Sequence, residues 1–189
     1  MPTSKRTKPA LPPFARPLLA GALAATALSA IDAQAALFLK ITGPEIKGES
    51  TNDKHKDEIV VTSFAQGFAA TIGGVGGASA GKPACAPIEI TKQLDLATGP
   101  LISAVMKGTI LQKSVFSFTA NGDQPRDFYR VTLSNSLVSS VVQSADGDRP
   151  GESVEFVPQQ IKLEYFRQND DGANELANST VIDCNSFKF

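Results

Sequence analysis

Residues 115–133 read VFSFTANGDQPRDFYRVTL, two β-prone segments on either side of an Asn-Gly pair at 121–122. Asn-Gly is a strong local signal for a tight β-hairpin, because both residues tolerate the positive φ that a two-residue hairpin turn requires. In the return segment, Tyr129, Val131 and Leu133 alternate with other residues and share one face of a strand. The stretch therefore predicts an antiparallel hairpin and an all-β fold.

Apolar alternation predicts further strands on both sides of this hairpin. The clearest precedes it: Ile88, Ile90 and Leu94 are expected to face inward, with Glu89 and Lys92 nearer solvent. The other expected strands cover 36–41, 58–72, 137–142, 154–165 and 180–189, and the apolar phase changes near Pro158, which predicts a β-bulge or bend.

One short helix is predicted, with Gly99 as its cap, Pro100 at the first helical position and Gly108 as its C-terminal stop. A helix of about eight residues is unstable alone, so it must dock on a sheet. The expected docking stripe is Leu101, Ile102, Val105 and Met106.

The segment 73–87 holds five glycines and two prolines and is expected to be a flexible or extended connection. No internal repeat or second folded domain is indicated. The predicted architecture is a single compact β-barrel or sandwich of antiparallel strands with one short flanking α-helix, over residues 36–189.

Residues 1–35 are expected to form a targeting segment rather than part of the fold. A basic region ending at Arg16 precedes an apolar run over 18–31, and the sequence at 33–35 is Ala-Gln-Ala, which suits signal peptidase. The run is shorter than the roughly 20 residues of a membrane-spanning helix, which disfavours the alternative of an anchor. We expect a signal peptide cleaved near Ala35 and an exported protein, periplasmic or secreted, with no membrane attachment afterwards.

The charge balance disfavours nucleic acid as a partner. The 189 residues carry a formal charge of -1, and residues 36–189 hold 14 basic and 18 acidic side chains, a remainder of -4. A mildly acidic surface is repelled by phosphate backbones and anionic lipid.

Two cysteines, Cys85 and Cys184, lie in the exported part. In an oxidising compartment such a pair is read first as a disulfide, and two isolated buried thiols are the alternative. The bridge would close a loop of about 100 residues and remove about 4–5 kcal/mol of unfolded-state entropy.

Several segments together carry a family resemblance: IKGES at 46–50, DKHKDEI at 53–59, and a strand, short helix and turn over 92–108. In this order they resemble the haemolysin-coregulated proteins (Hcp), the tube subunits of type VI secretion systems, over nearly all of 36–189. The resemblance implies a compact β-barrel with one helix that assembles into a homohexameric ring. Stacked rings would form a tube that carries small effectors and meets a spike protein.

Such a structural role needs no catalytic residues and no cofactor, so we do not expect this protein to be an enzyme. The family's tube subunits are ordinarily made without a signal peptide and load from the cytoplasm. An exported Hcp-like binding module outside a secretion tube is therefore the alternative function.

Other residue patterns are given structural interpretations. A phosphate-loop-like run, Gly76 to Lys82, is followed by Pro83 where Ser or Thr is needed, which argues against nucleotide binding. His55, the only histidine, is expected to be a solvated loop residue. The acidic segments 146–148 and 169–172 have turn chemistry rather than calcium-loop spacing. No catalytic, cofactor or metal site is predicted.

Overall fold

The computed structural model describes residues 36–73, 79–120, 125–145 and 150–184, without the side chains of 71–83. The expected signal peptide, the Asn-Gly turn and the 146–148 loop lie outside these residues. The elements are β1 (Ala36–Thr42), β2 (Ile59–Val61), β3 (Ser63–Ala65), β4 (Phe68–Gly73), β5 (Ser79–Cys85), β6 (Ile88–Gln93), α1 (Thr98–Lys107), β7 (Ile110–Ala120), β8 (Arg126–Ser144), β9 (Gly151–Gln168) and β10 (Asn174–Asp183).

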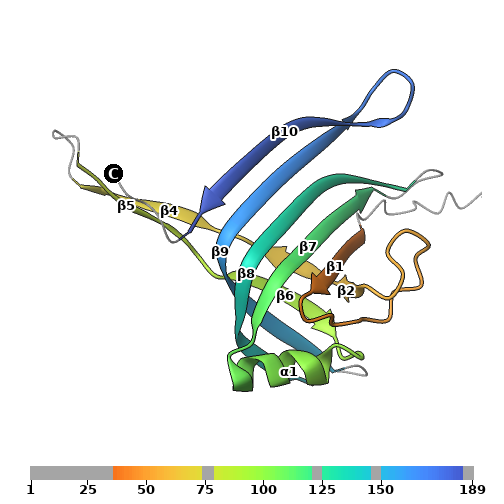
Figure 1. Cartoon of the computed structure of the whole chain (residues 1–189), viewed down its shortest axis with the longest axis vertical. Helices are drawn as coiled ribbons and strands as arrows, with labels where there is room; N and C mark the ends of the chain where they lie inside the picture. Colours follow the sequence, from red (N-terminus) through yellow and green to blue (C-terminus); the bar gives the residue numbers. More distant parts are fainter. Residues whose placement is uncertain (1–35, 74–78, 121–124, 146–149, 185–189) are drawn as a thin grey trace, which may run out of the picture. The chain divides into compact units, whose positions relative to one another are not determined.

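The main sheet has eight antiparallel strands in the order β2-β1-β7-β8-β9-β6-β3, with β10 alongside β9 (Figure 1). Its end strands β2 and β3 are neighbours in sequence, separated by Thr62, so the sheet bends over on itself. The all-β prediction with one helix is confirmed. Of the two predicted forms, the barrel is wrong, because the sheet is sandwich-like rather than closed.

The hairpin predicted from residues 115–133 is present as β7 and β8. Phe118 pairs with Tyr129, and Phe116 with Val131, in antiparallel register. The predicted strand at 137–142 is not separate, because β8 continues to Ser144 as a single long strand. A register shift between Val138 and Ser140 lets this long strand bend while it stays paired with β9.

Strand β6 corrects two expectations. Ile88 and Ile90 are buried as predicted, but Lys92 is buried with them. Strict alternation places Lys92 on the inner face, and its charge is accommodated there by carboxylates described below. Leu94 lies beyond the end of the strand and is partly exposed.

Helix α1 begins at Thr98, before the predicted Gly99–Pro100 start, and ends as predicted at Gly108, whose φ is 60°. Of the predicted stripe, Leu101 is buried and Val105 is partly buried against the core, and Ala104 is buried beside them. Ile102 and Met106 are exposed, because the helix contacts the sheet along an i, i+3 line.

Residues 74–78 of the glycine-rich segment lie outside the described residues, and residues 79–85 form a strand. Strands β4 and β5 pair with each other as a separate two-stranded sheet, which extends to one side of the main sheet in Figure 1. Pairing satisfies backbone groups that a loop would leave to water.

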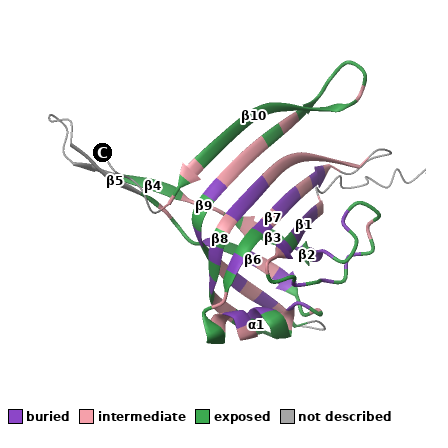
Figure 2. Cartoon of the chain, in the orientation of Figure 1, coloured by how far each residue is buried: buried purple, intermediate pink, exposed green. Residues whose placement is uncertain are grey.

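The buried residues form one core cluster, which lies mainly on the strands of the main sheet and on α1 (buried residues are purple in Figure 2). Buried positions in β9 change from even to odd numbers between Pro158 and Ile161, which confirms the predicted phase change. Aromatic edges meet in this core: Phe116 contacts Phe64 and Phe156. Leu101 of α1 is fully buried among the same residues, so the helix covers an end of the core.

Candidate functional site

The only histidine is buried, which corrects the expectation of a solvated loop residue. His55 is 5% exposed and stacks on Phe38 of β1, with ring centroids 4.3 Å apart and planes 9° apart. Although it belongs to the polar loop between β1 and β2, stacking on a strand residue draws it into the interior.

Each ring nitrogen of His55 faces a carboxylate. Nδ1 lies 2.9 Å from Glu58 Oε2, and Nε2 lies 3.0 Å from Asp127 Oδ1. Thr119 Oγ1 lies 3.1 Å from Nε2 and donates to Asp127 Oδ1 at 2.8 Å, while Arg130 donates to the other oxygen at 3.1 Å. The cluster joins the loop before β2 to the end of β7 and the start of β8.

Asp127 is the ionisable centre of this cluster. Burial by itself raises the pKa of its carboxyl, but the hydrogen bonds from Thr119 and Arg130, with the charge and hydrogen bond of His55, outweigh burial. The net pKa of Asp127 lies below its ordinary value. The ionised form is therefore the one that the fold stabilises.

A hydroxyl, an imidazole and a carboxylate in sequence resemble a nucleophile relay, but the geometry favours a structural role. Thr119 is 1% exposed, and its hydroxyl already donates to Asp127. The adjacent depression, of about 210 Å³, is lined by His55, Asp127 and four other residues, and Thr119 is not among them. A substrate in that depression would not meet the hydroxyl.

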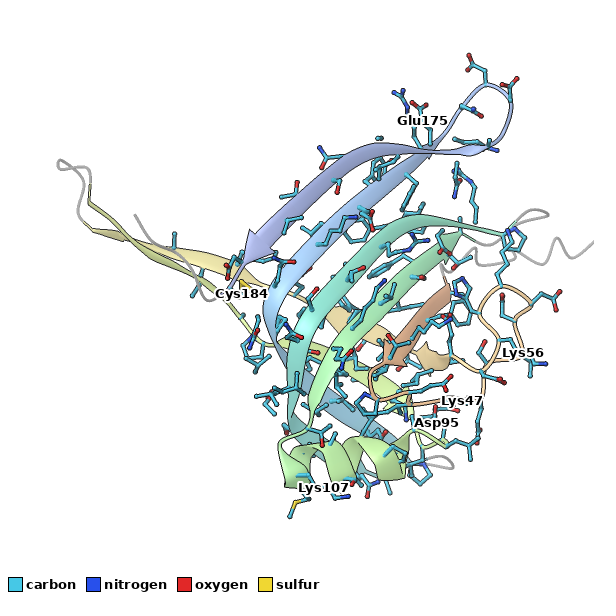
Figure 3. The ribbon with its side chains drawn as sticks, in the orientation of Figure 1. Lys47, Lys56, Asp95, Lys107, Glu175 and Cys184 are labelled. Carbon is cyan, nitrogen blue, oxygen red and sulfur yellow. A yellow bond between two sulfur atoms is a disulfide. The ribbon has the colours of Figure 1, made fainter. Side chains whose placement is uncertain are left out.

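A second buried polar cluster lies beneath the start of α1. Lys92 Nζ contacts Glu152 Oε1 at 2.6 Å and Asp95 Oδ1 at 2.7 Å, and donates to Gln93 O at 2.9 Å. Thr98 also donates to Glu152, at 3.1 Å. Asp95, labelled in Figure 3, accepts a hydrogen bond from the backbone of Ala97, so the cluster fixes the entry into α1.

The structure brings Cys85 and Cys184 together in a disulfide, with Cα atoms 5.6 Å apart (Figure 3). Cys85 ends β5 and Cys184 follows β10, so the bond joins the two-stranded sheet to the main sheet.

Of the remaining sequence patterns, Gly76 and the segment 146–148 lie outside the described residues. Lys82 and Pro83 lie in β5, a strand, whereas a phosphate loop needs a helix start at this point. The segment 169–172 is a turn: Gly172 N donates to Asn169 O at 3.0 Å, and Ala173 N to Asn169 Oδ1 at 2.7 Å.

No three His, Cys, Asp or Glu side chains within 36–73, 79–120, 125–145 and 150–184 gather as a metal site. In the same ranges no helix has the length and apolar character to cross a membrane.

Strand β10 has an exposed edge, and sequence reasoning placed this strand only partly. It begins at Asn174 rather than at Thr180, and its first eight residues are all exposed (Figure 2). It pairs with β9 on one side, and no described strand pairs with its other edge. The exposed Val181 and Leu176 lie on the face that also carries Lys162 and Phe166 of β9.

Comparisons with known proteins agree with this architecture. The family model described as "Type VI secretion system effector, Hcp" matches residues 38–165. A solved "type six secretion system protein" superposes with a TM-score of 0.71 at 25% identity, covering 79% of this chain and 95% of that one. No curated protein sequence matches the chain.

Two further solved structures share the fold. Hcp1 from Salmonella typhimurium has a TM-score of 0.62 at 24% identity, with 80% of this chain and 96% of that one covered. Hcp1 from E. coli EAEC 042 has a TM-score of 0.66 at 21% identity, with 80% and 98% covered. Because the family model spans well over half of the chain and the folds agree, this protein belongs to the Hcp family of type VI secretion proteins.

Proposed function

We propose that this protein is a structural subunit that assembles head to tail into a ring and works as a type VI secretion tube component, without catalysis. The exposed edge of β10 carries the proposal. This strand is ten residues long and contains no Lys, Arg or Pro, the residues by which natural edge strands usually avoid pairing. The strand carries Glu175 and Asp183 and a register shift between Leu176 and Asn178, but a long exposed edge remains an aggregation hazard unless another chain covers it.

A second copy is the occupant that fits this edge. A contact between the β10 edge of one copy and a different surface of the next repeats around an axis and closes a ring. By resemblance the ring has six members, stacks into a tube, meets a spike protein and carries small effectors. Family membership accords with secretion, and cleavage near Ala35 would place the mature protein in the periplasm or outside the cell.

The test is the oligomeric state of protein recovered after export of the full chain, by size-exclusion chromatography with light scattering and intact mass. The double substitution L176E/V181E adds charge along β10 and should convert the assembly to monomer. Val142 of β8 is a matched control, because it is 58% exposed against 56% for Val181. V142E should leave the assembly intact.

A wild-type protein that stays monomeric at high concentration would contradict the proposal. It would favour the alternative of an exported Hcp-like binding module. An intact mass that includes residues before Ala36 would separately contradict the expected cleavage.

A further inference from the structure

We propose that the Cys85–Cys184 disulfide is a redox-controlled lock that fixes the β4–β5 hairpin and the end of β10 to one another, and so favours assembly of the oxidised chain over the reduced one. The assembly half of this inference rests on the proposed function. The lock itself rests on the placement of the bond.

One end of the bond lies at the base of the hairpin. Cys85 pairs with Phe68 where β4 begins and β5 ends. Within the part of the chain that the structure describes, β4 and β5 pair with each other and with no other strand. Just outside this pair, Ala86 N donates to Gly67 O at 2.9 Å. An isolated two-stranded hairpin is marginally stable in water, so the orientation of β4–β5 depends on what holds its base.

The other end lies where the edge of β9 changes partner. Residues 151–156 of β9 pair with β6, and residues 160–168 pair with β10. Between them, Gln159 O accepts a hydrogen bond of 2.8 Å from Cys184 N. The disulfide thus lies where the edge of β9 passes from pairing with β6 to pairing with β10. Both cysteines are partly buried against the core.

The bond also bears on the proposed assembly edge. The end of β10 is held by β9 on one side only, and Cys184 is the first residue after it. Without the bond, the strand end can fray and the hairpin can change direction. With it, both are presented in one arrangement, and preorganisation lowers the entropy lost on association.

The chemistry is thiol–disulfide exchange. A thiolate of one cysteine attacks a sulfur of an oxidant of the disulfide class, whose own S–S bond breaks and releases one thiol. The second cysteine then attacks the mixed disulfide, forms the internal bond and releases the other thiol. The chain loses two electrons and two protons, and the oxidant is reduced to two thiols. Reducing compartments keep both cysteines as thiols, and oxidising ones pair them.

The test compares oxidised protein, dithiothreitol-reduced protein and the C85S/C184S variant, each produced from the full chain. Light scattering reports assembly, and amide hydrogen exchange reports residues 79–85 and 174–184. We expect exchange in both segments to quicken at least tenfold in the reduced protein and in the variant, and association to weaken at least tenfold. Dithiothreitol should change nothing in C85S/C184S, which controls for other effects of the reductant.

Each result decides one of the two claims. Equal exchange and equal assembly in all three samples would overturn the lock while leaving the proposed function standing. Absence of assembly in every sample would overturn the proposed function, and the exchange difference alone would then decide the lock. If alkylation and mass measurement find both thiols free in the exported protein, the lock is overturned directly.

Discussion

The buried ion pair between Lys92 and Glu152 provides a sharp test of how the sheet supports α1. Both side chains are completely buried, and the Lys92 ammonium contacts Glu152 at 2.6 Å and Asp95 at 2.7 Å. Glu152 Oε2 has no hydrogen-bond partner among the described residues, so its carboxylate depends on Lys92 and Thr98 through Oε1. The substitution K92M keeps an unbranched apolar side chain, shorter by one atom, and removes the charge.

Removing one partner of a buried pair strands the other charge, which costs about 3–5 kcal/mol of unfolding free energy. At about 2–4 °C per kcal/mol for a domain of this size, K92M should lower Tm by roughly 6–20 °C. The double variant K92M/E152M replaces both charges by apolar groups. Its loss of unfolding free energy should therefore be about 2 kcal/mol smaller than the sum of the losses in the two single variants. This coupling is near the upper range for contacting residues.

The assay is equilibrium denaturation with a double-mutant cycle. Lys162 is a matched control, because it contacts Glu164 at 2.7 Å but its side chain is 42% exposed. K162M should cost no more than about 1 kcal/mol, as exposed pairs do. The reasoning is refuted if K92M and K162M are equally destabilising, or if the costs of K92M and E152M simply add.

Three further predictions concern stability. C85S/C184S should lower the free energy of unfolding by about 4.7 kcal/mol, since the bond spans 99 positions; a loss in thermal melts worth under about 1 kcal/mol would contradict it. Because the folded pKa of Asp127 lies below its ordinary 3.8, its carboxylate contributes stability above about pH 4 that is lost as pH falls through the folded value. D127N should flatten this acid limb between about pH 5 and 2, and an unchanged limb in urea titrations would argue against it. G48A would press a Cβ against the backbone of Ile59 at the start of β2 and should destabilise by more than about 2 kcal/mol. G99A, with open space around it, should be neutral or stabilising by up to about 1 kcal/mol, and similar melts for the two variants would refute the steric reasoning.

The prediction that Lys92 lies nearer solvent was wrong, because Lys92 is buried. Ile88 and Ile90 were placed correctly by alternation alone, and the same alternation points Lys92 inward. Charge argued for solvent, because a lone buried ammonium is too costly. The cost is met by Glu152, which lies 60 positions further along the chain, a distance over which local pattern carries no information.

His55 was expected to be exposed and is buried for the same reason: most of its partners are distant in sequence. Its neighbours in sequence are polar, which favours exposure, and only Glu58 among its partners is local. Asp127 and Thr119 reach it from strands that lie more than 60 residues away. Local sequence patterns do not show that these three residues meet. Burial of His55 could be predicted only by knowing its distant partners.

By itself, the sequence determined the elements whose cause is local: the hairpin of β7 and β8, the phase change near Pro158, the end of α1 at Gly108 and the all-β class with one helix. Turn chemistry, apolar alternation and a left-handed residue each act within a few positions, so they can be recognised in the sequence. Only the tertiary structure decided the bent open sheet, the pairing of β4 with β5, the two buried polar clusters and the free edge of β10. Each of these depends on which distant segments become neighbours, and that is settled when the whole core packs at once.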